Sequence, residues 1–429
     1  MIPPNPRMDA EANTCLRFGV LLLAAGASGY RVIRAVKRCA RSVGFDNADV
    51  IVGFNTISCT FRRGEQFRTA VADVPLPGVN ASRIEALETV AHSLLQSYRT
   101  PEVIGAALDE IERIPSPRWG LRLSTAAAGL ACAGFAVLNQ FGYATAALVC
   151  VAAMLGQLVR ALLHRAHFNL IGTTMAAAFI AASAFLLLAQ VLPITGVVSP
   201  GFVAAVLFLI PGFPLFTSFV DLARFDFTAG IPRLLFALEI IVVIMLTVST
   251  VAMLSGTPEA QPATVPRSAE FMASGALASF VSVGCFALLF NSSRRMALVA
   301  AALGMAANAA RLTMLAYGVR AYLAAFAAAL LIGVAGGTLG RVAKVPRTTV
   351  TIPAAVVMIP GTVIYAAVHN FAVGDIINAL SRFTEVSFVV LFIAGGLSVG
   401  RMLTDPTWAF SRYIDFDHEL VGEERPINN

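Results

Sequence analysis

Apolar residues dominate the chain from about residue 120 to residue 403, where ten long apolar runs are separated by short polar segments. A helix needs roughly 20 consecutive apolar residues to cross the hydrocarbon layer of a bilayer. Each run is close to that length, so the pattern predicts ten transmembrane helices. Their expected boundaries are 120–138, 143–163, 170–192, 200–220, 232–254, 269–290, 295–316, 320–340, 350–371 and 384–403.

Before residue 118 the pattern is that of a small soluble domain. An apolar stripe at helical spacing predicts one helix over 13–43, and the basic residues that follow its apolar start disfavour a secretory signal peptide. Short β-branched and aromatic segments predict strands, with a hairpin turn at Arg62–Glu65. The expected strands are 50–54, 56–61 and 67–71, and further helices are expected over 82–98 and 102–114.

Prolines at positions 115 and 117 mark the end of the soluble domain, because proline blocks the continuation of a helix. The predicted fold class is an all-α polytopic membrane domain with a 5+5 inverted repeat, preceded by a small N-terminal α+β cytoplasmic domain. The expected segments are a cytoplasmic domain over 1–117, five-helix membrane modules over 118–256 and 267–404, and a cytoplasmic tail over 405–429.

Composition and charge support a membrane protein with both termini in the cytoplasm. Hydrophobic residues make up 57% of the chain and charged residues only 13%, so lipid is expected to solvate most of it. The net charge of +6 does not indicate a nucleic-acid partner, because the basic residues flank apolar runs instead of forming a patch. If the N-terminal domain is cytoplasmic and the chain crosses the membrane ten times, the inner side carries 13 Lys and Arg residues and the outer side four. This positive-inside bias predicts a plasma (inner) membrane protein with both termini in the cytoplasm.

The sequence offers little enzyme or metal chemistry. Six cysteines show no metal-binding spacing, and no nucleotide-binding GxxxxGK[ST] motif is present, so we expect no metal and no cofactor. His92 is the one histidine of the soluble domain. Ser28 and Ser58 lack recognisable His or Asp partners there, which leaves a membrane-tethered hydrolase as a weak alternative.

An internal repeat relates the two halves of the membrane domain. Ile210-Pro211-Gly212 recurs 149 positions later as Ile359-Pro360-Gly361. At the same offset Asp226 falls on Asp375 and Arg233 on Arg382. Each half has five predicted spans, and an odd repeat in tandem must enter the membrane from opposite sides. Such inverted repeats are typical of secondary transporters.

The two Pro-Gly spans are the expected substrate site. Proline removes a backbone donor, and a broken helix at membrane depth is tolerated only where it lines a cavity or is buried in protein. A simple kink absorbed by packing is the alternative interpretation. The residues predicted to contact substrate are Pro211, Gly212, Pro214, Thr217, Pro360, Gly361, Asn308 and Arg311.

Ionisable residues near the spans are candidates for proton coupling or gating, because charge at membrane depth is costly. Asp226 with Arg233, or Asp375 with Arg382, could face each other, as substrate contacts or as ion pairs that anchor a loop. Glu239 is the favoured proton carrier. Phe236 stands where the repeat has Glu385, which argues against a symmetric carboxylate pair. The full set is Asp221, Asp226, Glu239, Asp375, Arg233, Arg382 and Glu385.

The chain resembles the threonine/serine exporter family, in which a cytoplasmic domain precedes two five-helix modules. The resemblance is carried by the segment Leu22–Val32 (LLAAGASGYRV), by Gly78-Val79-Asn80, by Pro211-Gly212 with Asp221-Leu222, and by Ile359-Pro360-Gly361 preceded by Arg347. It implies export of threonine or serine coupled to the proton gradient. It also implies an alternative, because the two-subunit relatives are associated with succinate export.

The leading hypothesis is therefore a proton antiporter that exports threonine or serine from a site between the broken helices of the two modules. A dicarboxylate exporter is the first alternative, with Arg311 and Arg233 as the available cationic groups. The soluble domain is expected to regulate transport or to mediate assembly, and a homo-oligomer is an open possibility.

Overall fold

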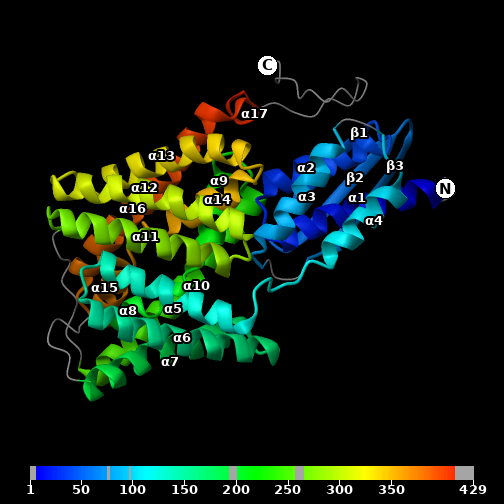
Figure 1. The fold of residues 1–429 in the computed structure, drawn as a ribbon. Helices are drawn as coiled ribbons and strands as arrows, with labels where there is room; N and C mark the ends of the chain where they lie inside the picture. Colours follow the sequence, from blue (N-terminus) through cyan, green and yellow to red (C-terminus); the bar gives the residue numbers. More distant parts are fainter. Residues whose placement is uncertain (1–5, 75–77, 96–97, 193–200, 257–264, 411–429) are drawn as a thin grey trace. The chain divides into compact units, whose positions relative to one another are not determined.

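The computed structural model describes residues 6–74, 78–95, 98–192, 201–256 and 265–410, and most of them are helical (Figure 1). Contacts divide the chain into two compact units. One contains residues 1–118, 213–235 and 401–429, and we call it the sheet unit. The other contains residues 119–212 and 236–400, and we call it the helix unit. The four segments predicted from the sequence stay a prediction.

The sheet unit contains the predicted three strands. They are β1 (Asn47–Val52), β2 (Thr56–Arg63) and β3 (Gln66–Asp73), in antiparallel order β1-β2-β3. Alternate residues of β2 are buried, because Ile57, Cys59 and Phe61 turn towards the core. The predicted hairpin forms, with Arg63 opposite Gln66 in the register. The helices of the N-terminal part of this unit are α1 (Pro6–Ala24), α2 (Gly29–Ser42), α3 (Ala81–Ser93) and α4 (Pro101–Glu112).

The prediction of a single helix over 13–43 is wrong, because the chain turns between α1 and α2. Gly26 has a φ of +89°, a left-handed conformation that glycine adopts readily at the end of a helix. The amide of Asn80 donates to the carbonyl of Ala25 at 3.0 Å, and a methyl group at Gly26 would lie 2.6 Å from the carbonyl oxygen of Gly78. The turn at 25–28 is therefore held by the Gly78–Asn80 segment.

The cysteines of the sheet unit are free and buried, so we predict that they resist alkylation in the folded protein. Burial raises the pKa of the Cys15 thiol, and it raises the pKa of Cys59 to about 12. The thiolate is the reactive form, so only ~10⁻⁴ of Cys59 is reactive at pH 8. N-ethylmaleimide labelling followed by mass spectrometry should modify both residues only after unfolding. A Glu65→Cys variant, on the exposed hairpin turn, should label in the folded state; equal labelling of Cys59 would contradict the prediction.

The membrane-spanning helices agree with the ten apolar runs. Eight helices are long and apolar enough to cross a bilayer, and two bent helix pairs bring the total to as many as ten over the described residues. The eight are α5 (Leu121–Leu138), α6 (Tyr143–Arg165), α7 (Leu170–Val191), α10 (Phe227–Ser255), α11 (Ala269–Leu289), α12 (Arg294–Ala316), α13 (Ala321–Val342) and α16 (Ile376–Thr404). A short α17 (Pro406–Ala409) follows.

The two bent pairs coincide with the two Pro-Gly motifs. In the first, α8 (Gly201–Ala204) and a 3₁₀ turn, η1 (Leu207–Leu209), meet α9 (Gly212–Leu222) at an angle of 61°. In the second, α14 (Arg347–Val356) meets α15 (Gly361–Ala372) at 57°. Both predicted spans are therefore interrupted where proline removes the backbone donor.

Small residues let the spans of the helix unit pack closely. Ser282 of α11 donates from its hydroxyl to the carbonyl of Ala131 in α5 at 3.0 Å, and Gly134 lies against the same serine. A methyl group at Gly333 would lie 2.9 Å from the Cα of Gly400. Such contacts are typical of helix packing in lipid, where small residues allow backbones to approach.

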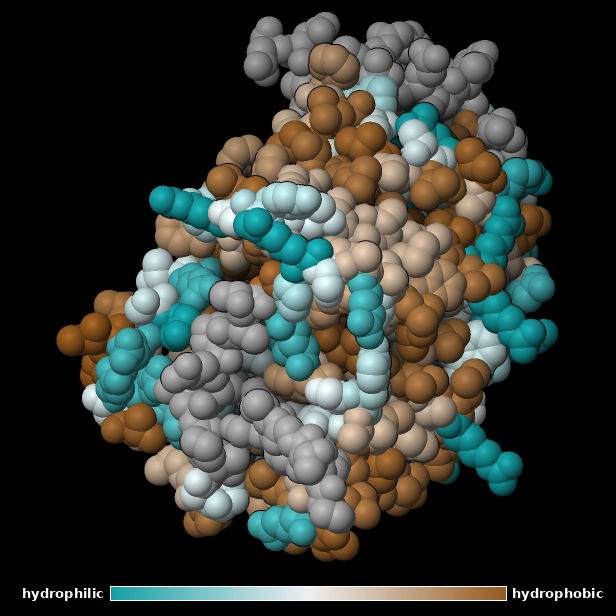
Figure 2. All heavy atoms as spheres, turned by 60° about the vertical axis from the view of Figure 1, so that its left-hand side comes forward, coloured by the Kyte–Doolittle hydropathy of each residue, from teal (hydrophilic) through white to brown (hydrophobic). Residues whose placement is uncertain are grey.

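Exposed apolar side chains mark the surface that faces lipid. Figure 2 shows one face of the molecule, most of which is covered by hydrophobic residues. Large side chains of this kind are exposed on several spans, among them Leu130, Val151, Phe179, Leu238 and Leu391. A soluble protein rarely exposes apolar surface on this scale, and a bilayer would cover it. The chain is therefore a multi-pass membrane protein.

Candidate functional site

The two helix breaks have the same backbone hydrogen bond. The amide of Gly212 donates to the carbonyl of Ile210 at 2.8 Å, and the amide of Gly361 donates to the carbonyl of Ile359 at 2.9 Å. Each of these bonds closes around a proline, which has no amide hydrogen of its own. The two motifs found in the sequence therefore produce the same local geometry.

Protein encloses the first half of each broken span. Residues 201–210 are all buried, and so are residues 348–359. The α8–η1 segment packs against α5 and α6, whereas α14 packs against α11, α12 and α13. Irregular backbone at membrane depth is tolerated in such surroundings because neighbouring groups can satisfy its polar atoms.

The two breaks contact each other reciprocally. A methyl group built at Gly212 would lie 2.5 Å from Cγ2 of Val356, and one built at Gly361 would lie 2.5 Å from Cδ2 of Leu207. Leu207 and Val356 are themselves 149 positions apart, the offset that relates the two glycines. Each break thus packs against the same place in the other repeat, as the two sides of a twofold-symmetric contact do.

The turns that follow the broken spans are also equivalent. Asp226 accepts a hydrogen bond at Oδ1 from the amide of Ala229, and Asp375 accepts one at Oδ1 from the amide of Asn378. Each aspartate thereby caps the helix that starts after it, α10 or α16. These two helices both contain 29 residues. The offset of 149 positions therefore holds in the hydrogen bonding as well as in the sequence.

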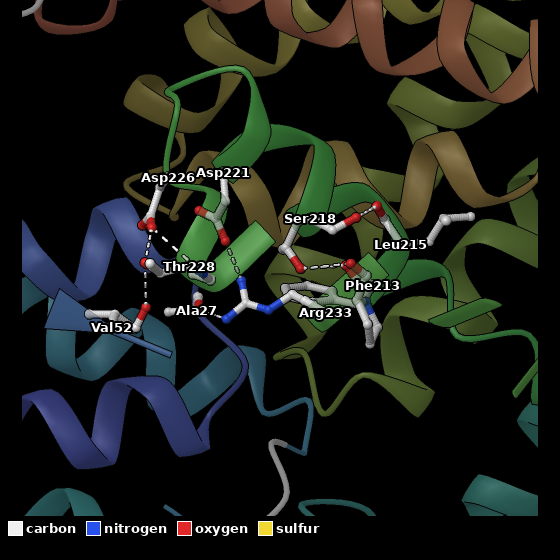
Figure 3. A network of polar contacts seen from close by, with 12 residues as sticks. Ala27, Val52, Phe213, Leu215, Ser218, Asp221, Asp226, Thr228 and Arg233 are labelled. Atoms are coloured by element: carbon white, nitrogen blue, oxygen red, sulfur yellow. Dashed lines mark hydrogen bonds and ion pairs between the residues drawn. The ribbon is translucent and has the colours of Figure 1, made fainter. Parts of the chain in front are cut away.

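A buried ion pair joins α9 to α10 within the sheet unit (Figure 3). Arg233 donates from NH1 to Oδ2 of Asp221 at 2.6 Å, and their side chains are 2% and 0% exposed. The guanidinium also donates from NH2 to the carbonyl of Ala27 at 3.1 Å. The pair is therefore neutralised, enclosed and bound to the turn between α1 and α2.

A second contact of the same network involves the cap of α10 (Figure 3). The hydroxyl of Thr228 lies 3.1 Å from the carbonyl of Val52, at the end of β1, and 2.9 Å from Oδ1 of Asp226. Gly29, the first residue of α2, lies directly against the Asp226 carboxylate. A side chain at position 29 would collide with it, so glycine is required for this approach.

The ion pairs differ from the two that the sequence suggested. Arg233 pairs with Asp221 and not with Asp226, because Asp226 turns back to cap α10. Arg382 pairs with Glu385 at 3.2 Å and not with Asp375, which caps α16. The pair at Arg382 is partly exposed, whereas the pair at Arg233 is buried.

The other predicted residues fall into different surroundings. Thr217 is buried and donates to the carbonyl of Phe213 on its own helix, while Pro211, Pro214 and Pro360 are half-buried. Glu239 is exposed on α10, next to exposed apolar residues such as Leu235 and Leu238, so it lies on a surface that faces lipid.

Asn308 and Arg311 form a polar chain inside the helix unit. The amide nitrogen of Asn308 donates to the hydroxyl of Ser279 at 2.7 Å, and Nε of Arg311 donates to the amide oxygen of Asn308 at 2.7 Å. Asn308 and Ser279 are fully buried. Arg311 has no carboxylate partner among the residues that the structure describes.

Two groups of contacts were missed by the sequence analysis. His369 in α15 meets Ser249 of α10 and Tyr365. Trp408 of α17 is buried against Tyr30 of α2, with the guanidinium groups of Arg224 and Arg401 within 5.1 Å of its ring centroid. A histidine four residues after a tyrosine in a Pro-Gly span was a usable signal for the first group; nothing local indicated the second.

Comparison with known proteins gives two family matches. Residues 13–255 match the model of a threonine/serine exporter family, ThrE, and residues 275–405 match a second threonine/serine exporter model. These are transporter models, so the chain is a transporter and not an enzyme. No solved structure matches the chain.

Two curated relatives are similar to about half of the chain. A protein named "Probable succinate transporter subunit YjjP" from Escherichia coli (strain K12) is 26% identical over 227 residues, which is 52% of this chain and 86% of the relative. Its counterpart from Klebsiella aerogenes is 26% identical over 228 residues, with the same coverage.

Proposed function

Because the chain belongs to the threonine/serine exporter family, we propose that it exports threonine or serine in exchange for protons. The substrate binds where the two broken spans cross. The observation that carries the proposal is the reciprocal contact of Gly212 with Val356 and of Gly361 with Leu207. Interrupted helices that meet near the bilayer midplane are how many secondary transporters form their sites.

The proposed mechanism uses two inverted five-helix repeats. Helix lengths support it, since α6 and α12 each have 23 residues and α7 and α13 each have 22. The positive-inside bias supports a topology in which the protein lies in the inner membrane with both termini in the cytoplasm. In the proposed alternating-access cycle, the contact between the two breaks stays fixed. The outer halves of the broken spans separate to open the site outwards, and the inner halves separate to open it inwards.

The Asp221–Arg233 pair acts in this proposal as an inner gate and not as a proton carrier. The two charges already pair with each other, and Arg233 is also bound to the carbonyl of Ala27. The cytoplasmic domain therefore holds the inner end of the first broken span. Opening towards the cytoplasm requires this contact to loosen, which gives the soluble domain control over transport.

A dicarboxylate such as succinate is the second candidate substrate. The curated relatives carry that substrate in their names, and Arg311 has a guanidinium that is not neutralised by a described carboxylate. Arg233 is unavailable for this role because Asp221 already occupies it.

Transport into proteoliposomes tests the proposal. The purified protein should accumulate radiolabelled threonine or serine when an opposing proton gradient is imposed, and a protonophore should abolish accumulation. Accumulation of succinate instead, lost in an Arg311→Gln variant, identifies the dicarboxylate alternative. If none of the three solutes exchanges or accumulates in vesicles that contain folded protein, the proposed function is wrong.

A further inference from the structure

His369 forms a small polar cluster inside the helix unit. Its Nδ1 lies 3.1 Å from the hydroxyl of Ser249 and 3.3 Å from the hydroxyl of Tyr365. The imidazole is stacked on the Tyr365 ring, with centroids 5.3 Å apart. Tyr365 is fully buried, and Phe202 packs edge-on against it at 5.4 Å.

The cluster joins three segments that alternating access must move. Phe202 belongs to α8, before the first break; Ser249 belongs to α10, which follows the first broken span; His369 belongs to α15, after the second break. The hydrogen bond between Ser249 and His369 therefore links the two halves of the repeat. At the repeat offset His369 falls on Val220, so the first repeat has no titratable group at this position.

Protonation changes what this imidazole can do. A neutral imidazole can accept a hydrogen bond at Nδ1 from either hydroxyl, whereas an imidazolium donates from both ring nitrogens. Gaining a proton therefore reverses the roles in the Ser249 contact and adds a charge. Histidine is the side chain whose ordinary pKa, about 6.5, puts this change near physiological pH.

The surroundings offer little to balance that charge. Among the described residues, Tyr365 is the titratable group that is hydrogen-bonded to His369, and the other partner, Ser249, is neutral. Glu239 lies ten residues before Ser249 on α10, about 15 Å away at 1.5 Å per residue. Asp375 and Arg382 follow α15, Asp375 exposed and Arg382 half-buried. Among the described residues no carboxylate pairs with the imidazole, so a charge on it would lack a partner while the cluster stays closed.

We propose that His369 is the proton-coupling residue of the transporter. A proton bound at the imidazole places a charge without a described carboxylate partner between α10 and α15, which favours opening of this end of the broken spans to water. Release of that proton restores the hydroxyl-to-Nδ1 bond and closes it. The proposal rests on the proposed function, since it names the group through which the proton gradient drives the same cycle.

The test separates coupling from binding. Wild-type and His369→Gln proteins are compared in proteoliposomes for accumulation driven by a proton gradient and for solute exchange without one. Accumulation should be lost in the variant, while exchange stays within about twofold of wild type and loses its pH dependence. A His167→Gln variant, on the exposed loop after α6, should behave like wild type.

Two results overturn the inference. Gradient-driven accumulation by His369→Gln at the wild-type level shows that the proton passes elsewhere. Loss of exchange together with accumulation, in a folded variant, shows that His369 holds the substrate or the fold. Ser249→Ala gives a second measurement, because it should shift the pH midpoint of exchange without abolishing accumulation, and an unchanged midpoint counts against the proposal.

Failure of the proposed function has a different signature. In that case the wild-type protein itself exchanges none of the three solutes. Titration of ¹⁵N-histidine signals in the full-length protein, assigned with His369→Gln, then still decides the inference. The His369 signal should change with pH, and Ser249→Ala should alter that change; a signal that is the same at every pH refutes the assignment.

Discussion

Arg233→Ala is expected to be the most damaging single substitution in the protein. It leaves the carboxylate of Asp221 fully buried without its partner, and it removes the hydrogen bond to Ala27. Removing one member of a buried ion pair costs about 3–5 kcal/mol, because the remaining charge stays out of water. We expect most of the folded protein to be lost, as measured by thermal unfolding and size-exclusion chromatography of the detergent-solubilised chain.

Two matched variants separate charge burial from general damage. Arg382→Ala removes the equivalent arginine of the second repeat, whose partner Glu385 is exposed, so it should cost less than about 1 kcal/mol. Asp221→Asn combined with Arg233→Met removes both charges and should recover much of the folded yield. If the double variant is as unstable as Arg233→Ala, an unpaired charge is not the cause.

The second large effect is expected at the crossing of the two breaks. Gly361→Ala pushes a methyl group to 2.5 Å from Leu207, and Gly212→Ala does the same against Val356. Overpacking of this kind typically costs about 1–3 kcal/mol or displaces the backbone. Because the substrate site is proposed at this crossing, transport should fall by at least about tenfold in either variant, measured as initial rate in proteoliposomes.

A second substitution at the contacted residue should rescue only the glycine variant that it contacts. Leu207→Ala should restore transport to Gly361→Ala but not to Gly212→Ala, and Val356→Ala should do the reverse. Gly142→Ala is the control, because a methyl group there meets no atom within 4 Å. Rescue without regard to partner, or full activity in both glycine variants, would contradict the reciprocal crossing.

The sequence predicts the fold well where the signal is local. The ten apolar runs and the three short strands follow from hydrophobic patterning, which depends on neighbouring residues alone. The helix break at Gly26 was missed because the apolar stripe continues on both sides of it. What fixes the turn is a hydrogen bond from Asn80, which lies 55 positions away in the chain.

The candidate site could be predicted only in part, for the same reason. Proline lacks the backbone amide hydrogen that a continuous helix needs, so a Pro-Gly pair in an apolar run predicts a broken helix from the sequence alone. The breaks at Pro211-Gly212 and Pro360-Gly361 were predicted in this way. Which charges pair is decided by contacts between distant segments. Arg233 reaches Ala27 across 206 positions and Ser249 reaches His369 across 120 positions, and no local pattern carries that information.

The sheet unit is assembled from parts of the chain that the ribosome makes at very different times. Residues 1–118 emerge first, residues 213–235 follow after α5, α6 and α7 have been made, and residue 401 onwards follows after almost all of the membrane helices. At about 5–20 residues per second, the 206 positions between Ala27 and Arg233 correspond to roughly 10–40 s of synthesis. The sheet unit therefore cannot complete its packing until almost all of the membrane helices have been synthesised, so its maturation reports that those helices have been made.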